Sequence, residues 1–260
     1  MGNTLRNITA IAGKELRTYY GSPVAWVLMG FFALVFGYFY DVFLTYFIQS
    51  ATSGGQFGGP PPPVHVNTDM IRPLLANASV LVLFLLPMIT MRTYSEEKRS
   101  GTIELLLTSP ITDLEITLGK FLGAVGVYGG LLAVTMLTVG ALFGLGDPEW
   151  KPVVSGYLGL LLLGCCFLSL GLFISSTTSN QIVAGAVTFV VALMFWIINW
   201  AAEGAGPTVG PLLNYLSVTQ HFEDFSKGVI DTKHIVFYLS FIVFGLFLTM
   251  KSVDTERWRG

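Results

Sequence analysis

A charged stretch near the middle of the chain has the residue types that suit contact with another protein. Glu96, Glu97, Lys98 and Arg99 follow one another, and Glu104 comes next within a leucine-rich run that ends before a proline. Mixed charges beside exposed leucines are typical of a surface that docks on a partner. On pattern alone, a solvated loop between two helices is the alternative.

The residues that follow predict the start of a new helix. Thr112 and Glu115 have the three-residue spacing of a capping box, in which each side chain binds the backbone N–H of the other residue. Ile111 and Ile116 flank this box as a hydrophobic staple. We therefore expect a membrane helix that begins outside the apolar layer.

Residue sets typical of an enzyme site do not occur in the sequence. The motifs GxxxxGK[ST], HExxH and GxSxG are absent, and the closest candidate for a phosphate-binding loop fails because Phe121 follows Gly119 and Lys120. Any nucleotide must therefore be bound by another protein. We expect no catalytic residue, no metal site and no cofactor bound directly by this chain.

Two further groups of ionisable residues have alternative interpretations. Asp41 follows Pro23 by about 27 Å of helix, which places it near the headgroups and makes an ion or proton role the less favoured reading. A second group could be drawn as a metal site, but its spacing is not that of ligands, and solvated loop charges are favoured. This group is His221, Glu223, Asp224, Asp231 and His234.

Composition identifies the bilayer as the solvent of this chain. Its 260 residues are 53% hydrophobic and only 12% charged, with a mean hydropathy of +0.67. Soluble domains carry about 25% charged residues. A net charge of −2 gives no basic surface for nucleic acid. Cys165 and Cys166 are neighbours in an apolar run, which favours packing over a disulfide.

Charge-free runs long enough to cross a bilayer predict six transmembrane helices in an all-α integral membrane protein. About 20 residues are needed for each crossing, and a polar interruption at residues 175–181 divides the longest run in two. The start of the chain lacks a signal-peptide pattern, so we expect the first span to stay as an anchor. The predicted spans are residues 24–46, 74–91, 120–144, 154–174, 182–201 and 235–251.

The distribution of basic residues predicts that both termini are cytoplasmic. With six crossings, 10 of the 14 Lys and Arg residues lie on the side of the termini, and only Arg72, Lys151, Lys227 and Lys233 lie on the other. Cytoplasmic loops are enriched in Lys and Arg. We expect a multi-pass protein of a bacterial inner membrane.

Three segments outside the spans have distinct patterns. Residues 3–20 have apolar side chains three and four apart, which predicts a helix lying in the interface; a helical flank of the first span is the alternative. Four prolines, Pro60 to Pro63, make the first outer loop extended. Residues 202–234 are too apolar for solvated coil, so we expect them to re-enter the membrane or lie along its outer boundary.

Glycines on the third predicted span allow close approach of another helix. Gly119 with Gly123, and Gly126 with Gly130, are four residues apart. This small-xxx-small pattern favours packing within the subunit over a substrate path.

Two segments resemble a known family of transporters. YSEEKRSGTIELLLTSPITDLEITLGKFLGA, residues 94–124, resembles the signature loop of permease subunits in the type-2 family of ABC exporters. HFEDFSKGVIDTKHIVFYLSFIVFGLFLT, residues 221–249, resembles the last outer segment and sixth helix of the same family. Within it, the chain looks most like the gliding-motility-associated and copper-enzyme-maturation permeases, although the four-proline loop is unusual.

The resemblance implies a membrane subunit that works with partners. It implies a dimer with a second permease copy or paralogue, and ATPase subunits that hold ATP and Mg²⁺ and hydrolyse the ATP. It also implies that residues 93–109 form a coupling helix seated on the ATPase. The contact set carried over from the family is Glu96, Glu97, Lys98, Arg99, Gly101, Thr102 and Glu104.

Other functions fit the sequence less well. A membrane enzyme needs paired nucleophile and base residues, and a stand-alone secondary transporter or channel usually shows charges or broken helices inside its spans. A third alternative keeps the architecture but makes the chain a membrane anchor or mechanical part of a surface machine such as gliding motility. We expect a transporter subunit that is not itself an enzyme.

Overall fold

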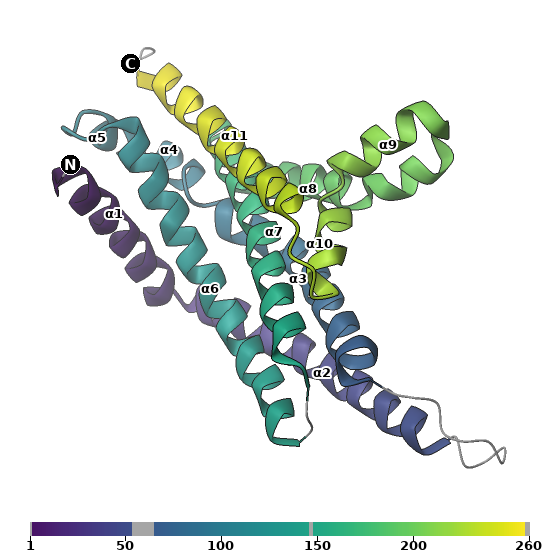
Figure 1. Cartoon of the computed structure of the whole chain (residues 1–260). Helices are drawn as coiled ribbons and strands as arrows, with labels where there is room; N and C mark the ends of the chain where they lie inside the picture. Colours follow the sequence, from purple (N-terminus) through teal and green to yellow (C-terminus); the bar gives the residue numbers. More distant parts are fainter. Residues whose placement is uncertain (1, 54–64, 146–147, 258–260) are drawn as a thin grey trace.

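A computed structural model describes residues 2–53, 65–145 and 148–257, and these residues form helices and turns without strands (Figure 1). Six of their helices are long and apolar enough to cross a membrane. The predicted fold class, an all-α integral membrane protein with six transmembrane helices, is confirmed. The six helices are α2 (Pro23–Ser53), α3 (Arg72–Thr90), α6 (Asp113–Leu145), α7 (Trp150–Thr177), α8 (Gln181–Gly204) and α11 (Thr232–Arg257).

Helix α7 forms the centre of the bundle, and α3, α6, α10 and α11 pack around it. Its glycines let neighbouring side chains approach the backbone: Tyr128 of α6 lies against Gly164 and donates a hydrogen bond to the carbonyl oxygen of Leu160 at 2.6 Å. Cys165 and Cys166 are buried and free in this packing. The central helix therefore holds the other spans through close contacts.

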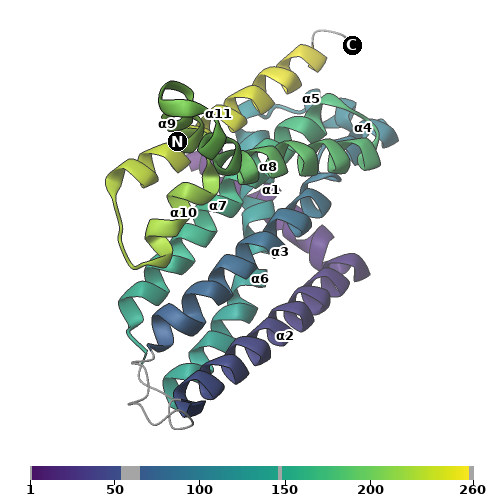
Figure 2. The same cartoon turned by 90° about the vertical axis from the view of Figure 1, so that its right-hand side faces the viewer.

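Helix α1 (Gly2–Gly21) lies along α6 and is joined to α2 through Ser22 (Figures 1 and 2). The glycines of α6 make room for it, because a Cβ atom added at Gly119 would lie 2.6 Å from Cβ of Ile11. The prediction that these glycines pack helices within the subunit is confirmed. The opposite face of α1 is exposed, as an amphipathic helix requires.

The segment between α8 and α11 forms two further helices, α9 (Gly206–Leu216) and α10 (Val218–Ser226). Helix α9 packs along α8, and α10 packs against α7, where Phe225 contacts Gly159 (Figure 2). Because protein covers α10, its position suits the expectation that backbone here is shielded. Whether this segment re-enters the membrane stays a prediction.

The loops at the opposite end from the termini are linked through one asparagine. A π-helix, η1 (Asn67–Ile71), precedes α3. The Asn67 side chain donates to the carbonyl oxygen of Glu149 at 2.8 Å and accepts from the Glu149 N–H at 2.9 Å. These two bonds join the start of α3 to the start of α7. The prolines Pro60 to Pro63 lie outside the described residues.

Candidate functional site

The charged stretch forms two short helices, where one continuous helix over residues 93–109 was expected. Helix α4 (Ser95–Ser100) ends at Gly101, whose φ of 73° is left-handed, and α5 (Thr102–Leu107) follows. A glycine adopts this conformation without the clash of a Cβ atom and so ends the first helix. Both helices lie at the end of the bundle that carries the two termini (Figure 1).

The start of α4 is held by a buried serine of α7. Oγ of Ser175 accepts hydrogen bonds from the backbone N–H groups of Tyr94 and Ser95, at 3.1 and 3.2 Å. The first N–H groups of a helix have no partner within the helix, so a buried helix start needs such an acceptor. Movement of α4 would therefore pull on the end of the central helix.

Lys120 of α6 lies at the centre of a buried ion cluster beside α4. Its Nζ donates to Oε1 of Glu15 at 2.9 Å, to Oε1 of Glu97 at 2.8 Å and to the carbonyl oxygen of Thr93 at 2.9 Å. The Lys120 side chain is only 1% exposed. Lys14 adds a second cation 3.8 Å from Glu97. The cluster thus balances two cations against two carboxylates and joins α1, α4 and α6.

A second ion pair fastens α4 to the last transmembrane helix. Nζ of Lys98 lies 2.6 Å from Oε1 of Glu256 on α11, and the Lys98 side chain is 10% exposed. Helix α4 therefore has polar contacts with α1, α6, α7 and α11. A displacement of α4 would reach all four helices directly.

The capping box at the start of α6 is confirmed. The Thr112 N–H donates to Oε2 of Glu115 at 3.1 Å, and the Glu115 N–H donates to Oγ1 of Thr112 at 3.3 Å. Asn7 of α1 donates to the same Glu115 oxygen at 3.2 Å. The helix cap therefore also fixes the first turns of α1.

The structure divides the predicted contact residues into two groups. Glu97 and Lys98 are turned toward the bundle, where their ion pairs hold α4 in place. The remaining five residues are exposed: Glu96, Arg99, Gly101, Thr102 and Glu104. Leu105 of α5, which lies near them in the sequence, is 74% exposed. Their contact with an ATPase stays a prediction, and Glu97 and Lys98 have roles within the subunit.

The sequence interpretation missed four residues that hold α4: Glu15, Lys120, Ser175 and Glu256. Lys120 was considered only as a failed phosphate-loop lysine, and Ser175 only as part of a polar turn. One signal was available for Lys120, because a lysine that begins a long apolar helix must find an anionic partner once it is buried. The identity of that partner depends on tertiary structure.

The second group of ionisable residues is packed in the protein, so the expectation of solvated loop charges is wrong for its two histidines. His221 and His234 are each 4% exposed, and their Nδ1 atoms are 2.5 Å apart. The His221 ring stacks on Phe237 with centroids 3.9 Å apart. Within the described residues, no three His, Cys, Asp or Glu side chains are placed to hold a metal ion.

The hydrogen bonds of this pair fix the tautomer of His221. Nε2 of His221 faces the carbonyl oxygen of Tyr215 at 2.9 Å and must donate to it, so Nδ1 of a neutral His221 accepts from His234. Nε2 of His234 lies 2.9 Å from Oδ2 of Asp224, and this bond lowers the pKa of Asp224. His234 therefore presents Nδ1 to His221 and Nε2 to the Asp224 carboxylate.

Acidification is expected to destabilise the junction of α10 and α11. Burial lowers the pKa of His221 below its ordinary 6.5, and the charges of His234 and Lys233 act in the same direction. The unfolded chain binds more protons as the pH falls below 6.5, so the stabilisation is complete above that pH and is lost below it. Protonation of His221 also removes the acceptor at its Nδ1.

Amide hydrogen exchange in detergent between pH 7.5 and 5.5 measures this effect, after correction for intrinsic exchange rates. As the pH is lowered, the protection of the amides of residues 217–235 against exchange should decrease in the natural chain. It should change little in His221→Gln, which keeps a donor for the Tyr215 carbonyl. His65→Gln is the matched control because His65 is exposed and lies outside this junction. Equal pH dependence in His221→Gln and the natural chain would contradict the assignment.

Asp41 lies on an exposed face of α2. The structure gives this carboxylate no buried partner among the described residues, so it adds nothing to an ion or proton role.

A comparison with known protein families identifies the chain. A family model described as "ABC-2 family transporter protein" matches residues 9–250, which include the α4–α5 pair, the first five transmembrane helices and most of α11. No curated protein matches the chain significantly. The family match agrees with six transmembrane helices and with a charged helical pair at one end of the bundle. The chain belongs to the ABC-2 family of transporter proteins and is a multi-pass membrane subunit.

Proposed function

We propose that the exposed face of α4 and α5 is the docking site of a separate ATPase, and that this chain transmits the work of ATP hydrolysis to its transmembrane helices. One observation carries the proposal: an exposed charged surface, formed by Arg99 and Glu104, belongs to a pair of helices of which α4 is tied to the bundle on its inner side. Leu105 gives this surface an apolar contact. Charge with a central apolar anchor suits a protein interface.

The anchoring of α4 supports a rigid-body mechanism. Closure of the ATPases would push α4, and the contacts with Glu15, Lys120, Ser175 and Glu256 would carry the displacement into α1, α6, α7 and α11. Such packed elements move between discrete arrangements more readily than they deform continuously. The chain would then alternate between a state open to the cytoplasm and a state open to the outer side of a bacterial inner membrane. Both of its termini would lie in the cytoplasm.

The low burial of two spans supports assembly with a second permease copy. In the most apolar 18-residue stretch of each helix, only 17% is buried inside the protein in α2 and in α8, compared with 72% in α7. Both helices pack on α3, and Phe84 of α3 is 53% exposed between them. This broad apolar face, formed by α2, α3 and α8, is the proposed contact with the second copy.

The work done by the complex is export or a mechanical task such as gliding motility. The specific resemblance to gliding-motility-associated and copper-enzyme-maturation permeases stays a prediction.

Reconstitution with the copurified ATPase tests the docking proposal. Leu105→Asp and the double change Arg99→Gln with Glu104→Gln should each lower permease-stimulated ATP hydrolysis by about tenfold, as expected for an interface anchor worth roughly 1.4 kcal/mol or more. Arg17→Gln is the control, because Arg17 is exposed at the same end of the molecule but lies on α1. Failure to copurify any ATPase, or unchanged hydrolysis in both variants, would refute the proposal.

A further inference from the structure

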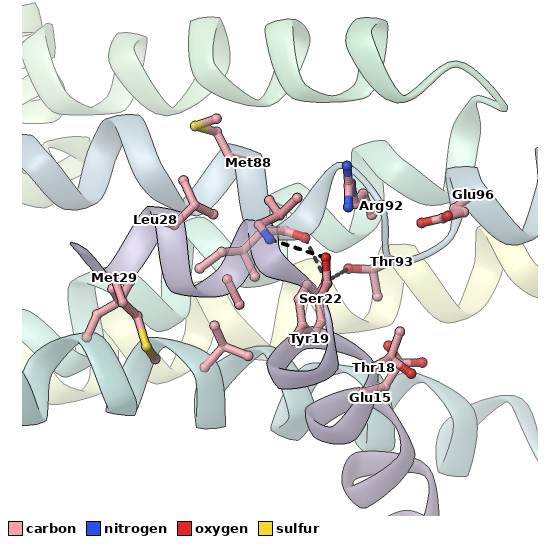
Figure 3. Close-up of a pocket in the computed structure, with 15 residues that line it drawn as sticks. Glu15, Thr18, Tyr19, Ser22, Leu28, Met29, Met88, Arg92, Thr93 and Glu96 are labelled. Atoms are coloured by element: carbon pink, nitrogen blue, oxygen red, sulfur yellow. Dashed lines mark hydrogen bonds between the residues drawn. The ribbon is translucent and has the colours of Figure 1, made fainter. Parts of the chain in front are cut away.

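A cavity of about 200 Å³ lies where α1 and α2 meet the end of α3 (Figure 3). Its apolar part includes Leu28, Met29 and Met88, which Figure 3 shows on one side. Arg92 and Glu96 lie on the other side with the hydroxyl-bearing residues Ser22 and Thr93. The lining is therefore divided into an apolar end and a charged end.

The polar groups of the cavity differ in whether the protein already satisfies them. The Tyr19 hydroxyl donates to the carbonyl oxygen of Ile89 at 2.7 Å, and Glu15 is paired with Lys120. Nε of Arg92, in contrast, is buried without a hydrogen-bond partner. Within the described part of the chain, neither Arg92 nor Glu96 forms an ion pair through its side chain. One cation and one carboxylate are thus left for a ligand.

The position of the cavity indicates where its ligand comes from. It lies at the bend between α1, which has one exposed polar face, and the transmembrane helix α2. Trp26 is 61% exposed at this bend, and its ring N–H donates to the Tyr20 carbonyl oxygen at 2.9 Å. Exposed tryptophans are typical of the boundary between lipid headgroups and acyl chains. The charged end of the cavity is therefore placed at headgroup level.

We propose that this cavity binds one membrane phospholipid with a primary-amine headgroup. The phosphate accepts hydrogen bonds from the Arg92 guanidinium, which binds phosphate oxygens well. The ammonium group lies by the Glu96 carboxylate, and the start of an acyl chain lies along Leu28 and Met88. A second anionic group in place of the ammonium would face Glu96, so an anionic lipid fits less well.

The bound lipid would fill the space between α1, α2 and α3 beside the ion cluster of Lys120. Since Glu15 lines the cavity and also pairs with Lys120, the lipid would support the position of α1 against α6. This role concerns the membrane subunit alone and does not depend on an ATPase. Its failure would therefore leave the docking proposal untouched.

Native mass spectrometry of the full chain in mild detergent tests the proposal with added dioleoyl phosphatidylethanolamine, phosphatidylglycerol, phosphatidylcholine or inorganic phosphate. One phosphatidylethanolamine per chain should be retained about tenfold better than the other lipids, as expected for the loss of one charge-assisted hydrogen bond. Arg92→Gln should remove retention of all three lipids, and Glu96→Gln should remove only the preference for the amine.

Arg99→Gln is the matched control, since Arg99 is exposed on α4, the helix that carries Glu96, but does not line the cavity. Leu28→Trp fills the apolar end and should prevent lipid retention without removing a charge. Size-exclusion profiles show that each variant is folded. The proposal is overturned if Arg92→Gln and Arg99→Gln retain lipid equally, if inorganic phosphate binds as well as the lipids, or if only nonspecific annular lipid is found.

Discussion

Replacing Lys120 by methionine is expected to lower the free energy of unfolding by about 3–5 kcal/mol, because removal of one partner from a buried ion pair leaves an unpaired charge. Among the described residues, Glu15 would lose the cation with which it pairs, and Glu97 would keep Lys14 at 3.8 Å. Methionine preserves most of the side-chain volume, so the change acts mainly through charge. We also expect stimulated ATP hydrolysis to be lost, since α4 would no longer be fixed to α6.

Unfolding in mixed micelles of a mild detergent and sodium dodecyl sulfate measures the stability of this variant. Lys14→Met is the matched control and should cost less than about 1 kcal/mol, because the Lys14 side chain is 65% exposed. Adding Glu15→Gln and Glu97→Gln to Lys120→Met should recover part of the lost stability, because no unpaired carboxylate remains. A triple variant less stable than Lys120→Met alone would contradict an electrostatic origin.

The charge-free runs of the sequence predicted that there are six transmembrane helices. Each crossing needs a long run without charge, and a bilayer leaves few other ways to satisfy backbone polar groups. The capping box of Thr112 and Glu115 could also be predicted, since its two hydrogen bonds join residues that are close in the sequence. Features set by one segment at a time were therefore accessible from the sequence.

Features that depend on contacts between distant segments were not accessible. Glu15 and Lys120 are separated by 105 positions, and neither has a neighbour in the sequence that indicates the other. The two histidines were predicted to be solvated because their spacing gives no sign of the Tyr215 carbonyl or of the Phe237 ring that packs on His221. For the same reason, the sequence could not show which contact residues of α4 face the bundle.

The break at Gly101 shows how one backbone position changed a local prediction. The resemblance to the transporter family implied one coupling helix over residues 93–109. The left-handed conformation of Gly101 turns the chain and directs α5 away from α4. Helix α4 thereby keeps its contacts with the bundle, while α5 presents Leu105 outward.

Gly123→Val is expected to cost about 1–3 kcal/mol of stability and to separate α1 from α6, because added volume in a tightly packed contact forces the backbone to move. A Cβ atom at this position would lie 2.6 Å from Cβ of Glu15 and 3.5 Å from the Ala12 carbonyl oxygen. The first of these contacts is too short for carbon atoms, and it involves the residue that pairs with Lys120. A shift of α1 would therefore also weaken the ion cluster.

Gly129→Val separates this packing effect from the effect of valine on the helix. Gly129 lies on the same helix, but a Cβ atom there would have no atom within 4 Å. Both changes replace glycine in a helix interior, where valine is no worse than glycine in intrinsic propensity. Gly129→Val should therefore unfold like the natural chain, whereas Gly123→Val should unfold earlier and show faster amide exchange in α1. Equal stability of the two variants would mean that α1 is free to shift along α6, and the rigid connection from α1 through Glu15 to α4 would have to be abandoned.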